Sequence, residues 1–189
     1  MQTQQVPIRG ARIALLIEQE FEGREVFSTH DALRAAGASV TIVGPTAPTE
    51  FTGKNGATVT SRLSARRARA DDFDALVIPG GWAPDRMRMR HAMVDLVRDV
   101  AAAGKPVAAI SHGPMMLISA KLVDERMVTC WPSIAIDIRN AGGLYMDKPV
   151  VEDGNVITSR KADDVTDFCA AIVQALSRHR GPSDTFAES

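Results

Sequence analysis

The sequence predicts an α/β fold in which a mainly parallel sheet lies between two layers of helices. Three short runs, residues 13–17, 76–78 and 107–110, are continuously apolar, as strands are when both faces of their sheet are covered. Segments with helical periodicity separate the strand-like runs, which is typical of right-handed βαβ crossovers. We therefore expect these three runs to form adjacent, central strands of one three-layer sandwich.

The composition favours one enzyme-sized domain without a polyanionic partner. The 189 residues fit a single domain with a core of about residues 12–176, a polar N-terminal arm and a polar C-terminal tail. The net charge is -1, which favours neither a nucleic acid nor a membrane as partner. No apolar stretch is long enough to be a signal or a membrane span, so we expect a cytoplasmic protein. Cys130 and Cys169 show no pairing pattern and suit reduced thiols.

The first half of the chain predicts a βαβ unit followed by a hairpin. A strand at 12–17 precedes a helical pattern that ends at Gly37, and the next strand covers residues 40–43. Residues 45–62 hold a glycine-containing turn and an alternating stretch. This pattern predicts a short hairpin outside the main sheet.

The second half predicts further strands and helices in alternation. We expect a hairpin over residues 150–158 because two apolar pairs flank a Gly-Asn turn. The last helix is expected to end near Leu176, before the polar tail. The remaining predicted elements are strands at 74–79, 106–110 and 128–130, and helices at 93–100, 115–122 and 132–139.

The chemistry is expected at the sharp turn between the strand at 106–110 and the helix behind it. Ser111 occupies the apex of this strand-turn-helix segment, the position of the nucleophile in a nucleophile elbow. Gly113 leaves room for the strand and helix to pass closely. The N–H groups at the start of the helix favour negative charge there, which suits a thiolate better than a serine hydroxyl.

Two further residues complete a hypothetical proton-transfer chain. His112 follows the apex residue, and an elbow lets the two side chains converge. His112 then needs an acid that orients it, and the candidate is Asp85 in the loop that follows the strand at 74–79. A solvated carboxylate, or a cap for the helix that follows, is an equally good interpretation of Asp85.

The same edge of the sheet carries other candidate site residues. Gly80 and Gly81 expose backbone N–H groups that can hold an oxyanion. Trp82 and Trp131 lie in loops beside the expected cleft, as wall or packing residues. Glu18, Glu20 and Glu22 crowd the end of the first strand, and we expect one of them to reach the cleft with a raised pKa. For Cys130, inert packing is favoured over reactivity.

Several segments together resemble the PfpI-type intracellular protease family. These are residues 75–81, 104–107, 110–114, 117–120, 140–142 and 151–160. The family belongs to the class I glutamine amidotransferase-like superfamily, which also includes the Parkinson-disease-associated protein deglycase. The resemblance runs from about residue 12 to residue 176 and implies a flavodoxin-like three-layer sandwich with a nucleophile elbow.

The resemblance also implies roles for particular residues. The nucleophile position is Ser111 and the adjacent histidine is His112. The acid of the triad is Asp85, contributed across a subunit interface, so a homodimer or larger homo-oligomer is expected. The glutamate that hydrogen-bonds the nucleophile is Glu22. The oxyanion glycines are Gly80 and Gly81, and no cofactor or metal is implied.

The chain departs from the family pattern at the nucleophile, where a serine replaces the usual cysteine. An engineered substitution is slightly favoured over a natural serine variant, because every other site position is kept. The parent activity implied is covalent chemistry on a small carbonyl substrate or a peptide, as in a cysteine peptidase, glyoxalase III or deglycase, with little activity expected of the serine form. The alternatives are a non-catalytic stress- or redox-responsive binding protein and an isocyanide hydratase.

Overall fold

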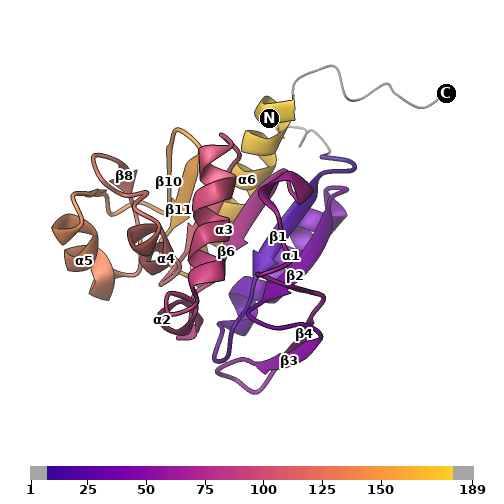
Figure 1. The fold of residues 1–189 in the computed structure, drawn as a ribbon. Helices are drawn as coiled ribbons and strands as arrows, with labels where there is room; N and C mark the ends of the chain where they lie inside the picture. The colour runs from indigo at the N-terminus through magenta and orange to yellow at the C-terminus, as the bar shows by residue number, and fades with distance from the viewer. Residues whose placement is uncertain (1–7, 181–189) are drawn as a thin grey trace.

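A seven-stranded sheet forms the centre of the computed structural model, which describes residues 8–180 (Figure 1). Its strand order is β10-β11-β7-β6-β1-β2-β5, and every pairing is parallel except that of β10 with β11. The strands are β1 (Arg12–Leu16), β2 (Ser39–Gly44), β5 (Leu63–Ser64), β6 (Ala75–Ile78), β7 (Val107–Ile110), β10 (Val150–Asp153) and β11 (Val156–Ser159). The three continuously apolar runs are β1, β6 and β7, so their predicted adjacency in the centre of the sheet is confirmed.

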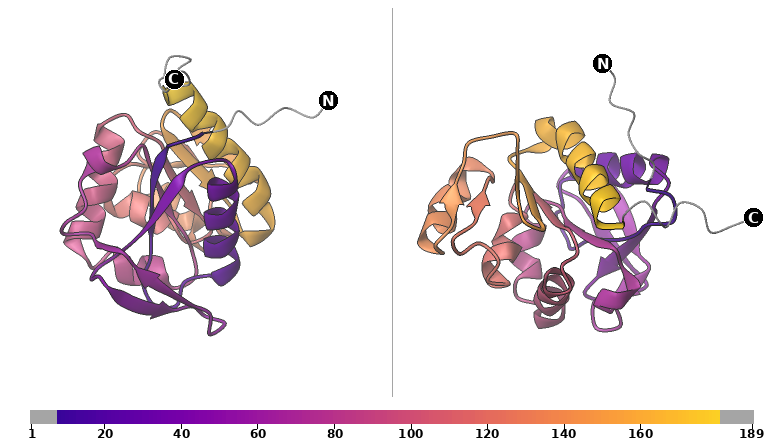
Figure 2. Two further views of the ribbon diagram at one scale, coloured as in Figure 1. Left: turned by 90° about the vertical axis from the view of Figure 1, so that its right-hand side faces the viewer. Right: turned by 90° about the horizontal axis from the view of Figure 1, so that it is seen from above.

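Helices cover both faces of this sheet. Figure 2 shows α1 (Gly23–Ala35) and α6 (Val165–Arg180) on one face, and α3 (His91–Ala102) on the opposite face. The shorter helices are α2 (Ala83–Met87), α4 (Pro114–Ser119) and α5 (Ala135–Asn140), with 3-10 turns η1 (Ala70–Asp72), η2 (Pro132–Ile134) and η3 (Ala162–Asp164). The arrangement is the predicted three-layer sandwich of the flavodoxin-like type.

The core lies where the central strands meet the apolar stripes of the helices. Leu76 and Ile78 on β6 are fully buried, as are Met93 and Val97 on α3 and Phe168 on α6. Helices α3 and α6 therefore each contribute an apolar stripe to the core, on opposite faces of the sheet. This packing fixes the carboxyl ends of β1, β6 and β7, where the predicted site residues lie.

Two small sheets lie outside the main one. The predicted hairpin is present as β3 (Thr49–Thr52) and β4 (Thr58–Ser61), an antiparallel pair. The predicted strand at 128–130 is shorter, as β8 (Met127–Val128), and pairs in parallel with β9 (Leu144–Tyr145). The segment from β8 to β9 thus forms a separate unit beside the carboxyl end of β7.

The last helix continues beyond its predicted end. Helix α6 extends to Arg180, so residues 177–180 are helical and not part of a polar tail. The Ser177 hydroxyl donates to the Val173 carbonyl at 2.9 Å, and Arg178 pairs with Glu152 on β10, which satisfies polar groups in this turn. The remaining predicted tail and the first seven residues lie outside the described part of the chain. Within residues 8–180, no helix combines the length and apolarity that crossing a membrane requires.

Candidate active site

The predicted elbow is present between β7 and α4. Ser111 has a φ of 61°, a left-handed conformation that non-glycine residues rarely adopt and that clusters at functional sites. Its backbone is held by hydrogen bonds from the Ser111 N–H to the Ser159 carbonyl (3.0 Å) and from the Trp131 N–H to the Ser111 carbonyl (2.9 Å). A Cβ atom on Gly113 would lie 2.6 Å from the Ile78 carbonyl oxygen, so only glycine fits there. The strained turn is therefore built into the packing of three strands.

Glu25 lies beside the Ser111 side chain. Its Oε2 accepts a hydrogen bond from the Gly80 N–H at 2.7 Å, and its carboxyl group is hydrogen-bonded to Ser111. The residue is 2 % exposed. Burial raises the pKa of Glu25 to about 7, and the hydrogen bond from Gly80 opposes part of that rise. A substantial fraction of the carboxyl group is protonated near neutral pH and can donate to the atom at position 111.

This placement corrects the expectation that Glu22 contacts the nucleophile position. Glu22 is the residue that precedes α1, and its half-buried carboxylate lies 3.7 Å from Lys54 Nζ. Glu25 instead belongs to the buried stripe of α1, four residues before Thr29 and eight before Leu33. That spacing was the sequence signal for Glu25, because residues four apart share a helix face.

His112 lies between two indole rings. Its ring centroid is 5.6 Å from that of Trp82 and 5.9 Å from that of Trp131, with an interplanar angle of 26° to Trp131. The Ser111 Oγ lies 3.4 Å from His112 Nδ1. Burial lowers the pKa of His112, and the positive charge of Lys54 lowers it further. His112 is therefore held neutral at physiological pH, able to accept a proton from position 111.

Lys54 is a site residue that the sequence reasoning missed. It comes from the β3–β4 hairpin, and its Nζ lies 5.3 Å from the centre of the Trp82 ring. A cation over an aromatic face is attracted to it, so Lys54 contributes to holding the outer wall of the site. A hairpin that lies outside the main sheet gives no sequence signal of this contact.

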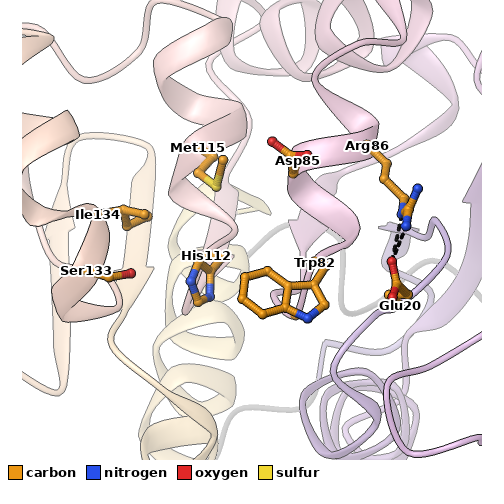
Figure 3. A pocket seen from close by; sticks show the side chains of 9 residues that line it. Glu20, Trp82, Asp85, Arg86, His112, Met115, Ser133 and Ile134 are labelled. Carbon is orange, nitrogen blue, oxygen red and sulfur yellow. Dashed lines mark hydrogen bonds and ion pairs between the residues drawn. The ribbon is translucent and has the colours of Figure 1, made fainter.

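A cavity of about 500 Å³ opens beside His112 (Figure 3). Trp82, Met115 and Ile134 supply its apolar lining. Of the three glutamates that follow β1, Glu20 lines this cavity, where it pairs with Arg86. The cavity has room for a small substrate, with both apolar and charged contacts.

Asp85 lines the same cavity, on helix α2 (Figure 3). Its side chain is exposed, and within residues 8–180 of one chain it makes no hydrogen bond to His112. The structure therefore brings Asp85 to the cavity without orienting His112 from the same chain.

The backbone N–H groups around Ser111 differ in whether they already have an acceptor. The Gly80 N–H is already used by Glu25, so Gly80 does not supply the expected oxyanion contact. A Cβ atom there would lie 2.7 Å from both Glu25 Oε2 and Ser111 Cβ, which shows why a glycine is needed. The N–H groups of Gly81 and His112 donate to no acceptor within the described chain. These two are the groups that can hold an oxyanion.

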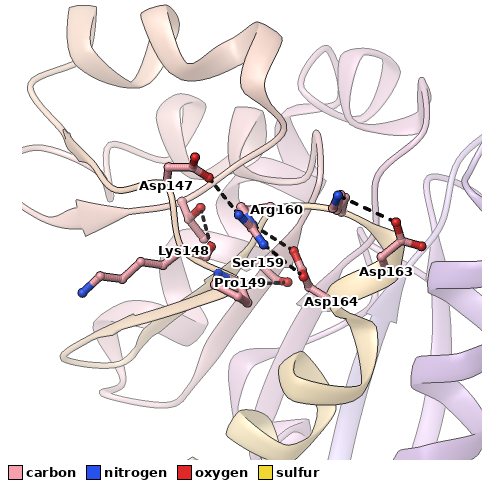
Figure 4. A network of polar contacts seen from close by, with 9 residues as sticks. Asp147, Lys148, Pro149, Ser159, Arg160, Asp163 and Asp164 are labelled. Carbon is pink, nitrogen blue, oxygen red and sulfur yellow. Dashed lines mark hydrogen bonds and ion pairs between the residues drawn. The ribbon is translucent and has the colours of Figure 1, made fainter.

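Polar contacts hold the segment that follows β9 against the end of β11 (Figure 4). Trp131 belongs to the adjoining β8–β9 unit. Arg160 follows β11 and pairs with Asp147 at 2.9 Å and with Asp164 at 3.0 Å. The Ser159 hydroxyl donates to the Pro149 carbonyl at 2.8 Å. These contacts fasten the end of the β8–β9 unit to the sheet edge beside the elbow.

The two cysteines take no part in this constellation. Both are free and buried, and burial raises the pKa of Cys130 to about 12 and that of Cys169 above its usual range. Burial and the raised pKa both favour packing over reactivity for Cys130. In the described part of the chain, no group of three or more His, Cys, Asp or Glu side chains is placed to hold a metal ion.

A buried acid, a histidine and a strained apex residue define this chain as an α/β protein of the nucleophile-elbow class. Residues 11–175 match the model of the DJ-1/PfpI family, and the chain belongs to this family.

Similar proteins share both the sequence and the fold. Protein/nucleic acid deglycase 2 of Escherichia coli is 42% identical over 159 residues, covering 83% of this chain and 92% of that protein. The structure of a two-domain protein from Anabaena variabilis, with DJ-1/ThiJ/PfpI-like and ferritin-like domains, is similar with a TM-score of 0.86 and 38% identity, covering 87% of this chain and 49% of that one. Drosophila melanogaster DJ-1beta has a TM-score of 0.83 at 27% identity, covering 90% and 93%.

Proposed function

We propose that this protein has the site of a deglycase-type enzyme that acts by covalent addition to a carbonyl carbon, with residue 111 as the nucleophile position. The observation that supports this most is the strained Ser111, whose side chain lies between the Glu25 carboxyl group and His112. A relative that is 42% identical is named a deglycase. Strain of this kind persists where function requires an exposed, oriented side chain.

Each group then has a task in the addition step. The nucleophile at position 111 forms a bond to the carbonyl carbon, and the carbonyl π electrons move to the oxygen. The N–H groups of Gly81 and His112 stabilise that oxyanion. Before the attack, the proton of the nucleophile passes to His112 Nδ1, and the Glu25 carboxyl group hydrogen-bonds the attacking atom.

The serine at position 111 makes this protein a poor catalyst. A hydroxyl group does not ionise near neutral pH, whereas a thiol does so readily beside hydrogen-bond donors. A site with a proton-donating Glu25 is suited to stabilise a pre-formed thiolate. We expect the serine form to fold normally and to be nearly inactive, whether the serine is engineered or natural.

The proposed assembly is a homodimer in which Asp85 of one subunit orients His112 of the other. Asp85 is exposed and lines the His112 cavity without bonding to that histidine in its own chain. A carboxylate from a second copy would hold the His112 ring for proton transfer.

The test compares the serine form with Ser111→Cys on four substrates: a methylglyoxal-modified amine, free methylglyoxal, a peptide amide and an isocyanide. A gain of about a hundredfold or more on one substrate supports the proposal and identifies the reaction. Turnover of the isocyanide alone would instead favour a hydratase.

Ser133→Cys is the matched control, because Ser133 lines the same cavity away from the elbow. If that variant gains as much activity as Ser111→Cys, a thiol anywhere in the cavity is sufficient for the reaction, and the proposal is wrong. If no substrate is turned over by either variant, the non-catalytic binding protein is the better account.

A further inference from the structure

The β3–β4 hairpin is tied to the active site by backbone hydrogen bonds. The Glu20 N–H donates to the Thr52 carbonyl at 2.7 Å, and the Lys54 N–H donates to the Phe21 carbonyl at 3.0 Å. The Trp82 N–H in turn donates to the Glu20 carbonyl at 2.9 Å. The segment that follows β1 therefore joins the hairpin to the loop that carries Trp82, and it fixes the backbones of Lys54 and Trp82 relative to each other.

The Lys54 side chain reaches from the hairpin to the Trp82 indole. Its Nζ lies 5.3 Å from the centre of the Trp82 ring and 3.7 Å from Glu22 Oε2. Trp82 is 53% exposed, so the protein interior does little to hold its ring. A cation over an indole face is attracted to it, and the Glu22 carboxylate keeps the ammonium group nearby. Lys54 is thus a contact that can hold this exposed ring in one place.

The same indole lies beside His112 (Figure 3). The two ring centroids are 5.6 Å apart, and His112 Nδ1 lies 3.4 Å from the Ser111 Oγ. Contacts therefore run in series from Lys54 through Trp82 to His112. This series links a charged residue of the hairpin to the histidine that accepts a proton in the proposed chemistry.

We propose that Lys54 is a positioning residue for His112, because it holds the Trp82 indole against the imidazole ring and so keeps that ring facing the side chain at position 111. The inference rests on the proposed function, in which His112 accepts the proton of residue 111. The Lys54 charge acts in the same direction. Burial lowers the pKa of His112, and the nearby cation lowers it further, so the ring stays free to accept a proton.

Other charged or titratable side chains near His112 come from the loop after β1 and from helices α1 and α2. They are Glu20, Glu22, Glu25, Asp85 and Arg86. All of them stay in place when Lys54 alone is changed. Removing the Lys54 charge also leaves Glu22 without its cation, and an unpaired carboxylate favours the imidazolium form. Both effects therefore raise the pKa of His112.

The test is an NMR titration of the His112 ring protons in the serine form, which needs no catalysis. Lys54→Met has a similar length without the charge, and we expect the proton affinity of His112 to rise about threefold or more. Lys54→Arg keeps the charge and the attraction to the indole, so His112 should titrate as in the parent.

Lys148→Met is the matched control, because Lys148 is an exposed lysine between β9 and β10. It should leave the titration of His112 unchanged. The proposal is overturned if His112 titrates alike in Lys54→Met and the parent, or if Lys148→Met shifts the titration as much as Lys54→Met does.

A double-mutant cycle with Trp82→Leu separates positioning from the effect of charge alone. Leucine is apolar but offers Lys54 no aromatic face. If Lys54 acts through Trp82, then Lys54→Met changes the His112 titration less in the Trp82→Leu background than in the parent. An equal change in both backgrounds would mean that Lys54 acts only as a distant charge, and the positioning role would be wrong.

Catalysis gives a separate result in the Ser111→Cys background. Lys54 does not line the cavity, so Lys54→Met should leave KM nearly unchanged while it lowers kcat about tenfold through the misplaced histidine, and Lys54→Arg should restore kcat. A rise in KM with kcat unchanged would contradict the positioning role. If Ser111→Cys itself turns over no substrate, the proposed function fails, and the titrations in the serine form still decide the role of Lys54.

Discussion

Glu25 is the residue whose protonation links the site to the stability of the fold. Its pKa is about 7 in the folded protein because the side chain is buried, against 4.5 for an ordinary glutamate. The folded state therefore binds more protons than the unfolded state between these two values. Because stability falls with pH wherever the folded state binds more protons, Glu25 destabilises the protein increasingly from about pH 4.5 upward. The full cost, about 3 kcal/mol, is reached above pH 7.

Glu25→Gln is expected to remove this cost. The amide oxygen can still accept from Gly80 and the amide NH₂ can donate to Ser111. The free energy of unfolding, measured by urea denaturation, should match that of the parent near pH 4 and exceed it by up to about 3 kcal/mol near pH 8. Glu22→Gln is the control, and its effect should be small at both pH values. A stability difference for Glu25→Gln that does not change with pH would contradict the account.

At this scale the sequence led to the correct elbow but to the wrong glutamate. Ser111, His112 and Gly113 are adjacent in the chain, so one motif predicts their positions together. Glu22 and Glu25 lie in a segment where a loop becomes a helix, and one turn of helix decides which carboxyl group faces the core. The sequence also suggested an oxyanion contact for the Gly80 N–H. That group instead donates to Glu25, a hydrogen bond that could not be foreseen without knowing that Glu25 faces the core.

The elbow is the element on which the site depends. Gly113 has ordinary helical dihedral angles, so glycine is needed there for space and not for backbone conformation. The carbonyl oxygens of Ile78 and Ile110 lie 2.6 and 2.8 Å from where a Cβ atom would stand. These are backbone atoms of two central strands and cannot move aside easily.

Gly113→Ala should destabilise the protein by about 2 kcal/mol or more, because it forces β6, β7 and the start of α4 apart. The matched control is Gly104→Ala, where nothing lies within 4 Å of an added Cβ and only the positive φ of 75° opposes it. That strain alone costs about 1 kcal/mol. Urea denaturation measures the free energy of unfolding of both variants. If the two variants lose the same amount of stability, the close approach at Gly113 does not contribute to it.

The central strands and the long helices were predictable from the sequence. Strands that are buried on both faces appear as continuous apolar runs, and helices appear as apolar residues with helical periodicity. The hairpin of β3 and β4 was predictable for another reason, the glycine-containing turn and the alternating stretch within residues 45–62. The end of α6 was misplaced because its last turn is polar, and polar residues alone do not distinguish an exposed helical turn from a tail. The contact of the hairpin with the active site, through Lys54 and Trp82, had no local pattern at all.

At the scale of the whole molecule, the proposed homodimer predicts that two inactive variants can complement each other. If Asp85 acts across the interface, then an Asp85→Asn subunit and a His112→Ala subunit complement each other when both carry Ser111→Cys. A mixed dimer has one complete site, because His112 of the first subunit meets Asp85 of the second. Random mixing should restore roughly a quarter of the parent activity, since half of the dimers are mixed and each has one working site.

The measurement is the rate of substrate turnover after co-refolding of the two variants. Each variant alone should be inactive, and two samples of the same variant serve as the control. If mixing restores nothing while each variant still forms dimers, then Asp85 and His112 act within one chain or not together. Sedimentation that shows only monomers at micromolar concentration would also remove the basis of this proposal.

The central claim is that position 111 is built to hold a thiolate, and alkylation of Ser111→Cys tests it most directly. Iodoacetamide reacts with thiolates, so the pH dependence of alkylation reports the pKa of the introduced thiol. Cys130 and Cys169 serve as internal controls, because both are buried with raised pKa values. The account predicts that peptide mapping finds alkylation at position 111 already below about pH 7, with both native cysteines unmodified. Alkylation at position 111 that rises only near the ordinary thiol pKa of about 8.5 would contradict it.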